Sequence, residues 1–182
     1  GGKVFIDRVL AMGIRTGALV CSRVTQAVSY IMSQWSHSLV VYLDDMAGVS
    51  PEAEAQTGFE TLGRELENAG LVEAPDKPCP PSQEMTFLGI LLNTVSMQAS
   101  IPPDKLKEVK ELVQVWLKKK SASKRQLQSL LGKLHFMAKC VRPGRLFVSR
   151  LLTHLRTLPE QNSSFLISSE FRKDLKWWNL FM

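Results

Sequence analysis

The sequence predicts an α+β fold, with short antiparallel strands and helices in the first hundred residues and helices in the remainder. Apolar residues recur at helical spacing in several segments, whereas β-branched and aromatic runs broken by turn signals occur in two others. Charge divides the chain at the same place. Residues 1–100 hold 6 Lys/Arg against 11 Asp/Glu, and residues 101–182 hold 17 against 6.

Two helices and a hairpin are predicted in the acidic part. A helix over residues 16–32 follows from apolar residues at helical spacing, which are Val20, Val24, Ala27, Val28 and Ile31. The apolar run at residues 38–49 is interrupted by Asp44 and Asp45, so we expect a hairpin with two carboxylates at its bend. A second amphipathic helix over residues 52–69 ends at Gly70, because glycine favours the left-handed conformation that follows many helices.

A proline-rich connector and a second hairpin follow. Four prolines in residues 74–81 exclude a helix there, because proline lacks an N–H donor and fixes φ. Residues 86–92 predict one strand, and we expect it to pair through a turn at Asn93 and Thr94 with residues 96–101.

Three helices are predicted in the basic part. The first begins at Asp104 and continues to the lysine triplet at residues 118–120, where cations favour the negative end of a helix. Ser123 and Gln126 form a capping-box pattern that begins a second helix. Apolar residues from 146 to 158 predict a third.

The charge pattern of the basic part is typical of nucleic-acid binding. No acidic residue lies between Glu111 and Glu160, and a field of one sign over that length favours a polyanionic partner. An anionic membrane surface is the weaker alternative, and every apolar run is far shorter than the roughly 20 residues that cross a bilayer. The candidate phosphate-contacting residues are Lys118, Lys119, Lys120, Lys124, Arg125, Lys133, Arg142 and Arg145.

The strongest candidate for a chemical site is the Tyr-Leu-Asp-Asp motif at residues 42–45. Carboxylate oxygens are ligands that Mg²⁺ prefers, and this ion leaves coordination positions for substrate phosphates. In a two-metal site, one ion activates the attacking hydroxyl and the other stabilises the leaving oxygens. The alternative interpretation of the motif is an ordinary Asp-Asp turn.

Several blocks in the same order resemble the reverse transcriptases of retroelements and are most similar to those of DIRS-like (tyrosine-recombinase) retrotransposons. Residues 12–25 resemble the family's Gly-Leu-Arg-Ser-type segment, and residues 42–45 resemble its palm hairpin. Residues 69–77 and 81–83 resemble the family's next motif, and residues 87–90 resemble its primer grip. Residues 126–134 and 141–145 resemble the thumb, and residues 174–178 resemble the approach to the RNase H region.

The resemblance implies a partial polymerase palm, made of antiparallel hairpin strands with helices, followed by a helical thumb. The palm would occupy residues 1–101 and the thumb residues 102–167, and residues 168–182 would lead toward an RNase H region. The implied activity of the parent protein is RNA-directed DNA polymerisation, with deoxynucleoside triphosphates added to a DNA or RNA primer on an RNA template. The implied cofactor is Mg²⁺ or Mn²⁺, and the implied location is intracellular, in the cytoplasm or nucleus.

The resemblance also assigns roles to individual residues. Metal binding would fall to Asp44 and Asp45, and catalysis would add Lys77 as a general acid to pyrophosphate. The residues implied to face the nucleotide, template or primer end are Gly13, Arg15 and Tyr42. Those implied to form the primer grip are Phe87, Leu88 and Gly89.

The sequence departs from the family pattern in one respect that matters for chemistry. Reverse transcriptases take a further metal-binding aspartate from a strand upstream of the segment that residues 12–25 resemble. The one early candidate here is Asp7, which lies only five residues before Met12 and is therefore interpreted as an ordinary surface or turn residue. We therefore expect a fragment that lacks this aspartate, the fingers and RNase H, and that has little activity by itself. Two alternatives remain open: a non-catalytic nucleic-acid-binding remnant, and an interaction fragment that folds only with the missing regions.

Overall fold

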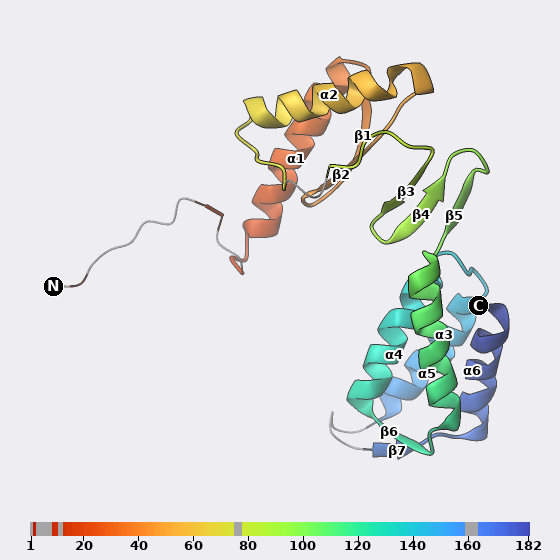
Figure 1. Cartoon of the computed structure of the whole chain (residues 1–182). Coiled ribbons are helices and arrows are strands. Elements are labelled where there is room, and N and C mark those ends of the chain that lie inside the picture. The colour runs from red at the N-terminus through yellow and green to blue at the C-terminus, as the bar shows by residue number, and fades with distance from the viewer. Residues whose placement is uncertain (1, 3–8, 11–12, 75–77, 159–163) are drawn as a thin grey trace. The chain divides into compact units, whose positions relative to one another are not determined.

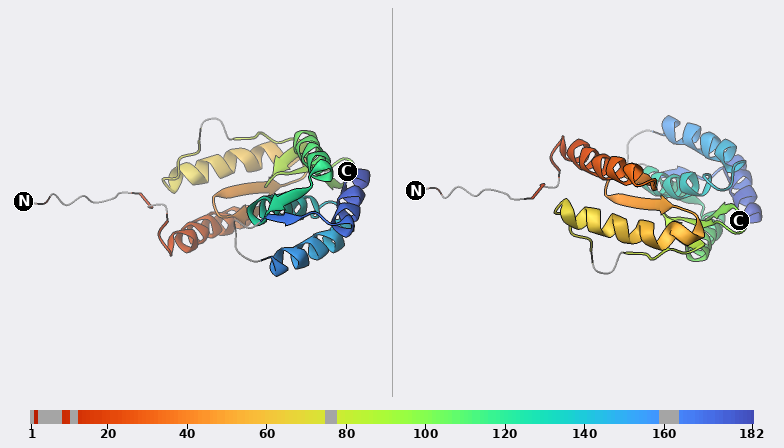
Figure 2. Two further views of the ribbon diagram at one scale, coloured as in Figure 1. Left: turned by 90° about the horizontal axis from the view of Figure 1, so that it is seen from below. Right: turned by 90° about the horizontal axis from the view of Figure 1, so that it is seen from above.

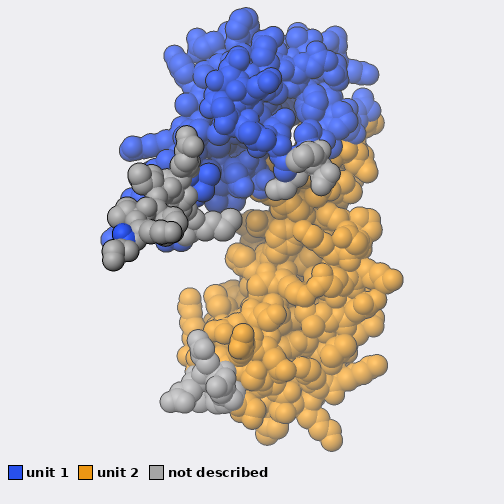
Figure 3. Space-filling view, turned by 60° about the vertical axis from the view of Figure 1, so that its left-hand side comes forward, with its two compact units in different colours: residues 1–83 blue, residues 84–182 orange. Residues whose placement is uncertain are grey.

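The computed structural model describes residues 2, 9–10, 13–74, 78–158 and 164–182. Within these residues the chain forms six helices and seven short strands (Figures 1 and 2). It divides into two compact units, residues 1–83 and residues 84–182 (Figure 3), called unit 1 and unit 2 below. The predicted α+β class is confirmed.

Unit 1 contains the two helices and the hairpin that the sequence predicts. Its elements are α1 (Gly17–Gln34), β1 (Ser38–Tyr42), β2 (Asp45–Val49) and α2 (Glu52–Asn68). Val28, Met32 and Leu66 form a small core between the helices, and Leu39 and Met46 of the hairpin pack against it.

The buried stripe of α1 differs from the apolar residues that predict this helix. Val28 and Met32 are buried, whereas Val20, Val24 and Ile31 are each about two-fifths exposed. Spacing alone predicts a helix but does not say which of its apolar residues meet another element. The exposed residues give α1 an apolar surface that no described residue of unit 1 covers.

Unit 2 begins with a three-stranded antiparallel sheet of β3 (Glu84–Phe87), β4 (Ile90–Asn93) and β5 (Gln98–Ser100). The prediction of one continuous strand over residues 86–92 is wrong, because the chain reverses at Leu88 and Gly89. Both residues have positive φ, 48° and 75°, the pattern of tight two-residue hairpin turns. The predicted turn after β4 is confirmed, and Asn93 Oδ1 accepts hydrogen bonds from Val95 N at 3.0 Å and Ser96 N at 2.9 Å.

Four helices form the rest of unit 2. The elements in order are α3 (Pro103–Lys118), β6 (Ser121–Ser123), α4 (Lys124–Met137), α5 (Gly144–Thr157), β7 (Ser164–Leu166) and α6 (Ser169–Phe181). The helices α3 and α5 each pack against both α4 and α6 (Figure 1). The predicted capping box is confirmed, because Ser123 Oγ accepts from Gln126 N at 3.3 Å and Gln126 Oε1 accepts from Ser123 N at 3.1 Å.

The division between the units lies at residues 83 and 84, whereas the predicted palm extends to residue 101. Ile101 is buried among the helices and Ile90 packs against the same core, so β3–β5 belong to the helical unit. The tail that would lead toward RNase H also packs there. Trp178 has no exposed surface, and the ring of Trp177 stacks on Phe147 with centroids 4.1 Å apart.

No helix in the described part of the chain is both long and apolar enough to cross a membrane.

Candidate functional site

The two adjacent aspartates lie at the exposed tip of the β1–β2 hairpin. Tyr42 pairs with Asp45, so Leu43 and Asp44 form a two-residue turn. Leu43 has a φ of 54°, which the tight turn requires and which a Leu side chain adopts rarely. Asp44, Asp45 and Tyr42 are all exposed, and 58% of the Tyr42 surface is accessible.

The strand register separates the two faces of this hairpin. Leu39 and Met46 point toward the core between α1 and α2. Tyr42 and Asp45 are directly opposed on the other face, because side chains alternate along a strand. The hairpin therefore presents an aromatic ring and a carboxylate on its open face, with Asp44 beside them in the turn.

The two carboxylates fit a hard divalent cation. Mg²⁺ is often bound through one or two carboxylates, with water and phosphate oxygens as the other ligands. Among the described residues, no group of three or more His, Cys, Asp or Glu side chains is placed to hold a metal ion. The ligands that the hairpin can offer are therefore two carboxylates, those of Asp44 and Asp45, with the remaining positions left to water or phosphate oxygens.

The other predicted residues of unit 1 are less informative. Gly13 has a φ of +86°, which favours glycine, and it lies with the exposed Arg15 in the approach to α1. The Ile14 carbonyl accepts a hydrogen bond from Gly17 N at 2.9 Å, which fixes this approach. Lys77 and Asp7 lie outside the described residues.

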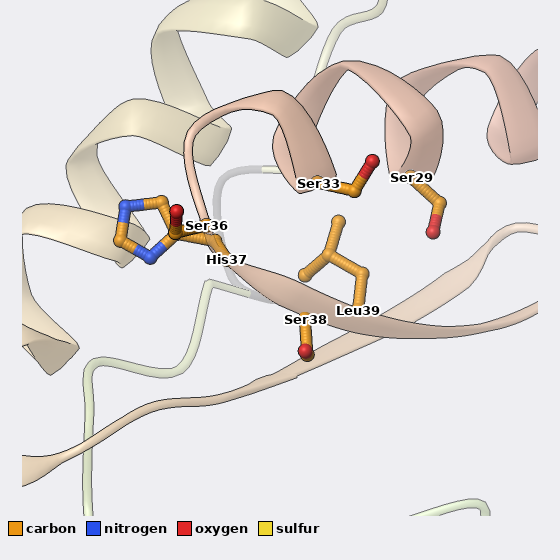
Figure 4. A pocket seen from close by; sticks show the side chains of 6 residues that line it. All are labelled: Ser29, Ser33, Ser36, His37, Ser38 and Leu39. Atoms are coloured by element: carbon orange, nitrogen blue, oxygen red, sulfur yellow. The ribbon is translucent and has the colours of Figure 1, made fainter.

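Unit 1 also has a hollow of about 310 Å³ at the C-terminal end of α1 (Figure 4). It is lined by one leucine, one histidine and four serines, which are Leu39, His37, Ser29, Ser33, Ser36 and Ser38. Figure 4 shows the His37 ring beside a neighbouring helix, and its Nδ1 would lie 3.1 Å from a Cβ built at Gly58 of α2. None of the predicted site residues lines this hollow.

In unit 2, the Leu88–Gly89 turn lies against α3 and α4. A Cβ built at Gly89 would lie 2.7 Å from Lys105 Nζ and 3.1 Å from Phe136 Cζ. The structure therefore brings the predicted primer-grip turn together with Lys105 and Phe136, which are not among the predicted site residues. The available signal was Gly89, because a glycine inside an apolar run indicates a turn or a close approach.

The predicted phosphate-contacting cations fall into two groups. Lys124 Nζ donates to the Leu158 carbonyl at 2.8 Å, Lys133 forms an ion pair with Glu108, and Lys119 Nζ lies 5.1 Å from the Trp116 ring centroid. Lys124 and Lys133 thus have a hydrogen-bond or ion-pair partner within the protein, and Lys119 is half-buried beside an aromatic ring. The exposed members of the set are Lys118, Lys120, Arg125, Arg142 and Arg145.

One buried carboxylate lies outside the set of predicted site residues. Asp174 is 4% exposed, and its Oδ1 lies 3.1 Å from Arg150 Nη1. Burial raises the pKa of Asp174, and the Arg150 guanidinium offsets part of that rise. This pair joins α5 to α6 inside unit 2.

The structure is similar to solved reverse transcriptases, although no family model and no curated protein matches the sequence. A foamy viral protease-reverse transcriptase in complex with an RNA/DNA hybrid matches with a TM-score of 0.66 and 17% identity, over 92% of this chain and 21% of that chain. A foamy viral protease-reverse transcriptase in complex with double-stranded DNA matches with a TM-score of 0.63 and 18% identity, over 92% of this chain and 32% of that chain. The dRH form of this protein in complex with double-stranded DNA matches with a TM-score of 0.63 and 19% identity, over 88% of this chain and 26% of that chain.

These matches show that the chain has a reverse-transcriptase-like fold. The chain spans between about a fifth and a third of the length of those proteins. The resemblance to DIRS-like retrotransposons stays a prediction.

Proposed function

We propose that this chain is the palm and thumb portion of a retrotransposon reverse transcriptase of the DIRS-like kind. The parent protein would add deoxynucleotides to a primer 3′ end on an RNA template. The observation that carries the proposal is the exposed Asp44–Asp45 tip of a helix-backed hairpin, within a chain of reverse-transcriptase-like fold.

Asp44 and Asp45 would hold Mg²⁺, or Mn²⁺ in its place, because both are hard cations that prefer carboxylate oxygens. When bound, such ions activate the primer hydroxyl and neutralise charge on the phosphates. Tyr42, on the same open face as Asp45, would lie against the primer end. Gly13 and Arg15 would face the template or the nucleotide, and Lys77 would protonate the departing pyrophosphate.

Unit 2 would hold the primer–template duplex. The Leu88–Gly89 turn, with Phe87 before it, would position the primer strand. The exposed cations of α4, α5 and the end of α3 would contact phosphates, and such contacts fix register without reading sequence. The cations with internal partners, Lys124 and Lys133, would contribute less.

The metal assignment is tested by Mn²⁺ titration of the labelled chain in NMR. Paramagnetic broadening should centre on the amides of residues 42–46, and the double variant Asp44→Asn/Asp45→Asn should abolish it. Asp104→Asn, which removes an exposed carboxylate from α3, is the matched control and should leave the broadening unchanged. Broadening centred elsewhere, or unaffected by the double variant, would overturn the assignment.

The alternative function is nucleic-acid binding without catalysis. It is favoured by the exposed cations of unit 2, which could grip a duplex without any metal. Primer extension by a longer chain that contains these residues separates the two functions. Extension that is lost with Asp44→Asn supports the polymerase, whereas duplex binding with no extension in either form supports the alternative.

A further inference from the structure

A pocket of about 240 Å³ lies between α3 and α4 in unit 2. Its floor is apolar, formed by Val109, Gly132, Phe136 and Met137, and at Gly132 a Cβ would meet nothing within 4 Å. Charged side chains form its rim: Lys105, Lys133 and Glu108. The pocket thus combines a small apolar surface with cations, a combination that suits a sugar-phosphate backbone.

Two ammonium groups share one aromatic ring at this pocket. Lys105 Nζ and Lys139 Nζ each lie 5.2 Å from the centroid of the Phe136 ring. Cation–π attraction holds an ammonium group near a ring without neutralising its charge. The acidic group of the rim does not neutralise them either, because Glu108 is paired with Lys133.

The Lys105 ammonium also lies beside the hairpin turn that precedes α3. Gly89 packs so closely that a side chain there would meet the Lys105 ammonium and the edge of Phe136. Gly89 therefore lets a cation reach the backbone of the turn. This places a positive charge beside the segment assigned to the primer strand.

We propose that Lys105 and Lys139, held over Phe136 beside the Leu88–Gly89 turn, bind phosphates of one nucleic-acid strand whose sugars lie on the apolar floor of the pocket. The inference deepens the proposed function and rests on it. Because each ammonium group lies 5.2 Å from the same ring centroid, the two can be no farther apart than twice that distance, a span that two neighbouring phosphates of one strand can cover. Neither lysine belongs to the set of phosphate contacts predicted from the sequence.

Binding of a fluorescent RNA/DNA hybrid to the full chain, measured by anisotropy over a salt series, tests this site. Lys105→Gln and Lys139→Gln should each weaken binding about tenfold near 0.1 M salt and reduce the slope of log K against log[salt] by about 1. Lys107→Gln removes an equal charge from an exposed position on α3 and should change neither the affinity nor the slope by a comparable amount. Lys105→Arg should retain the slope.

The outcomes separate this inference from the function beneath it. If the unsubstituted chain binds the hybrid but Lys105→Gln and Lys139→Gln behave like Lys107→Gln, the phosphate site is overturned and the proposed function stands. If the unsubstituted chain does not bind the hybrid, both are overturned. Both lysines are exposed, and an unchanged melting temperature in each variant shows that a loss of binding is not a loss of folding.

Discussion

Arg150 and Asp174 show how one residue pair can couple the stability of unit 2 to pH. The carboxylate is buried and the guanidinium is half-exposed. Because burial raises the folded-state pKa of Asp174 above its unfolded value, the folded state holds this proton more tightly. The contribution to stability is full below the unfolded pKa and is lost as pH rises through the folded pKa.

Replacing the cation should make this dependence steeper. Arg150→Met leaves the Asp174 charge buried without its partner, so we expect the free energy of unfolding at pH 7 to fall by about 1–3 kcal/mol. The loss should shrink at acid pH, where Asp174 is protonated. Urea unfolding at several pH values measures it, with Arg145→Met on the same helix as the control. An equal loss at every pH would show that only packing, not charge, had been removed.

The residues of the candidate site differ in how far sequence could predict them. Asp44 and Asp45 are predictable because the signal is local: two carboxylates interrupt an apolar run and so mark the bend of a hairpin. The place of Lys105 beside the hairpin turn is not predictable, because it depends on the proximity of Gly89 and Phe136, which are distant from Lys105 in sequence. No periodicity or spacing encodes such a meeting.

At the scale of elements, the packing of α5 against α6 depends on a glycine at the start of α5. A Cβ built at Gly144 would lie 2.6 Å from Trp178 Cζ2, a buried ring atom. Gly132 in the middle of α4 offers the opposite case, since a Cβ there meets nothing within 4 Å. The same substitution at the two positions therefore has opposite consequences.

Gly144→Ala should destabilise the protein by about 1–3 kcal/mol through overpacking against Trp178. Gly132→Ala should stabilise it by up to about 1 kcal/mol, because alanine favours a helix interior more than glycine does. Thermal unfolding of both variants measures the difference. A stabilising Gly144→Ala would mean that α6 moves away from α5 at little energetic cost.

Local sequence signals account for both the wrong strand prediction at residues 86–92 and the correct prediction of where α4 begins. Ser123 and Gln126 are spaced as a capping box requires, so the start of α4 could be read from the sequence. The β3–β4 turn has Leu88 at a position where Asn or Gly is usual, so the apolar run at residues 86–92 resembled a single strand. Only the pairing of Phe87 with Ile90 shows the reversal.

At the scale of the whole molecule, the two units differ in how much apolar surface they bury. Among the described residues, the core of unit 1 has three buried hydrophobic residues and that of unit 2 has seventeen. Local opening requires less free energy where fewer buried contacts must break. Unit 1 should therefore open more readily than unit 2.

Hydrogen exchange measured by mass spectrometry should show this difference. Amides of α1, α2 and the β1–β2 hairpin should exchange faster than those of α4 and α6 in the same sample. Such a pattern would also support the view that unit 1 needs a partner for full stability. Equal protection across both units would contradict it and would mean that the small core is sufficient.

The β1–β2 hairpin also affects how the protein behaves at high concentration. It is a sheet of only two strands among the described residues, so each strand has an edge to which another molecule can add. Unit 2 carries 17 Lys/Arg against 7 Asp/Glu, and mutual repulsion between these charges keeps molecules apart in dilute buffer. Added salt weakens that repulsion. The colloidal stability of the protein is therefore coupled to the same cations that would hold a nucleic acid.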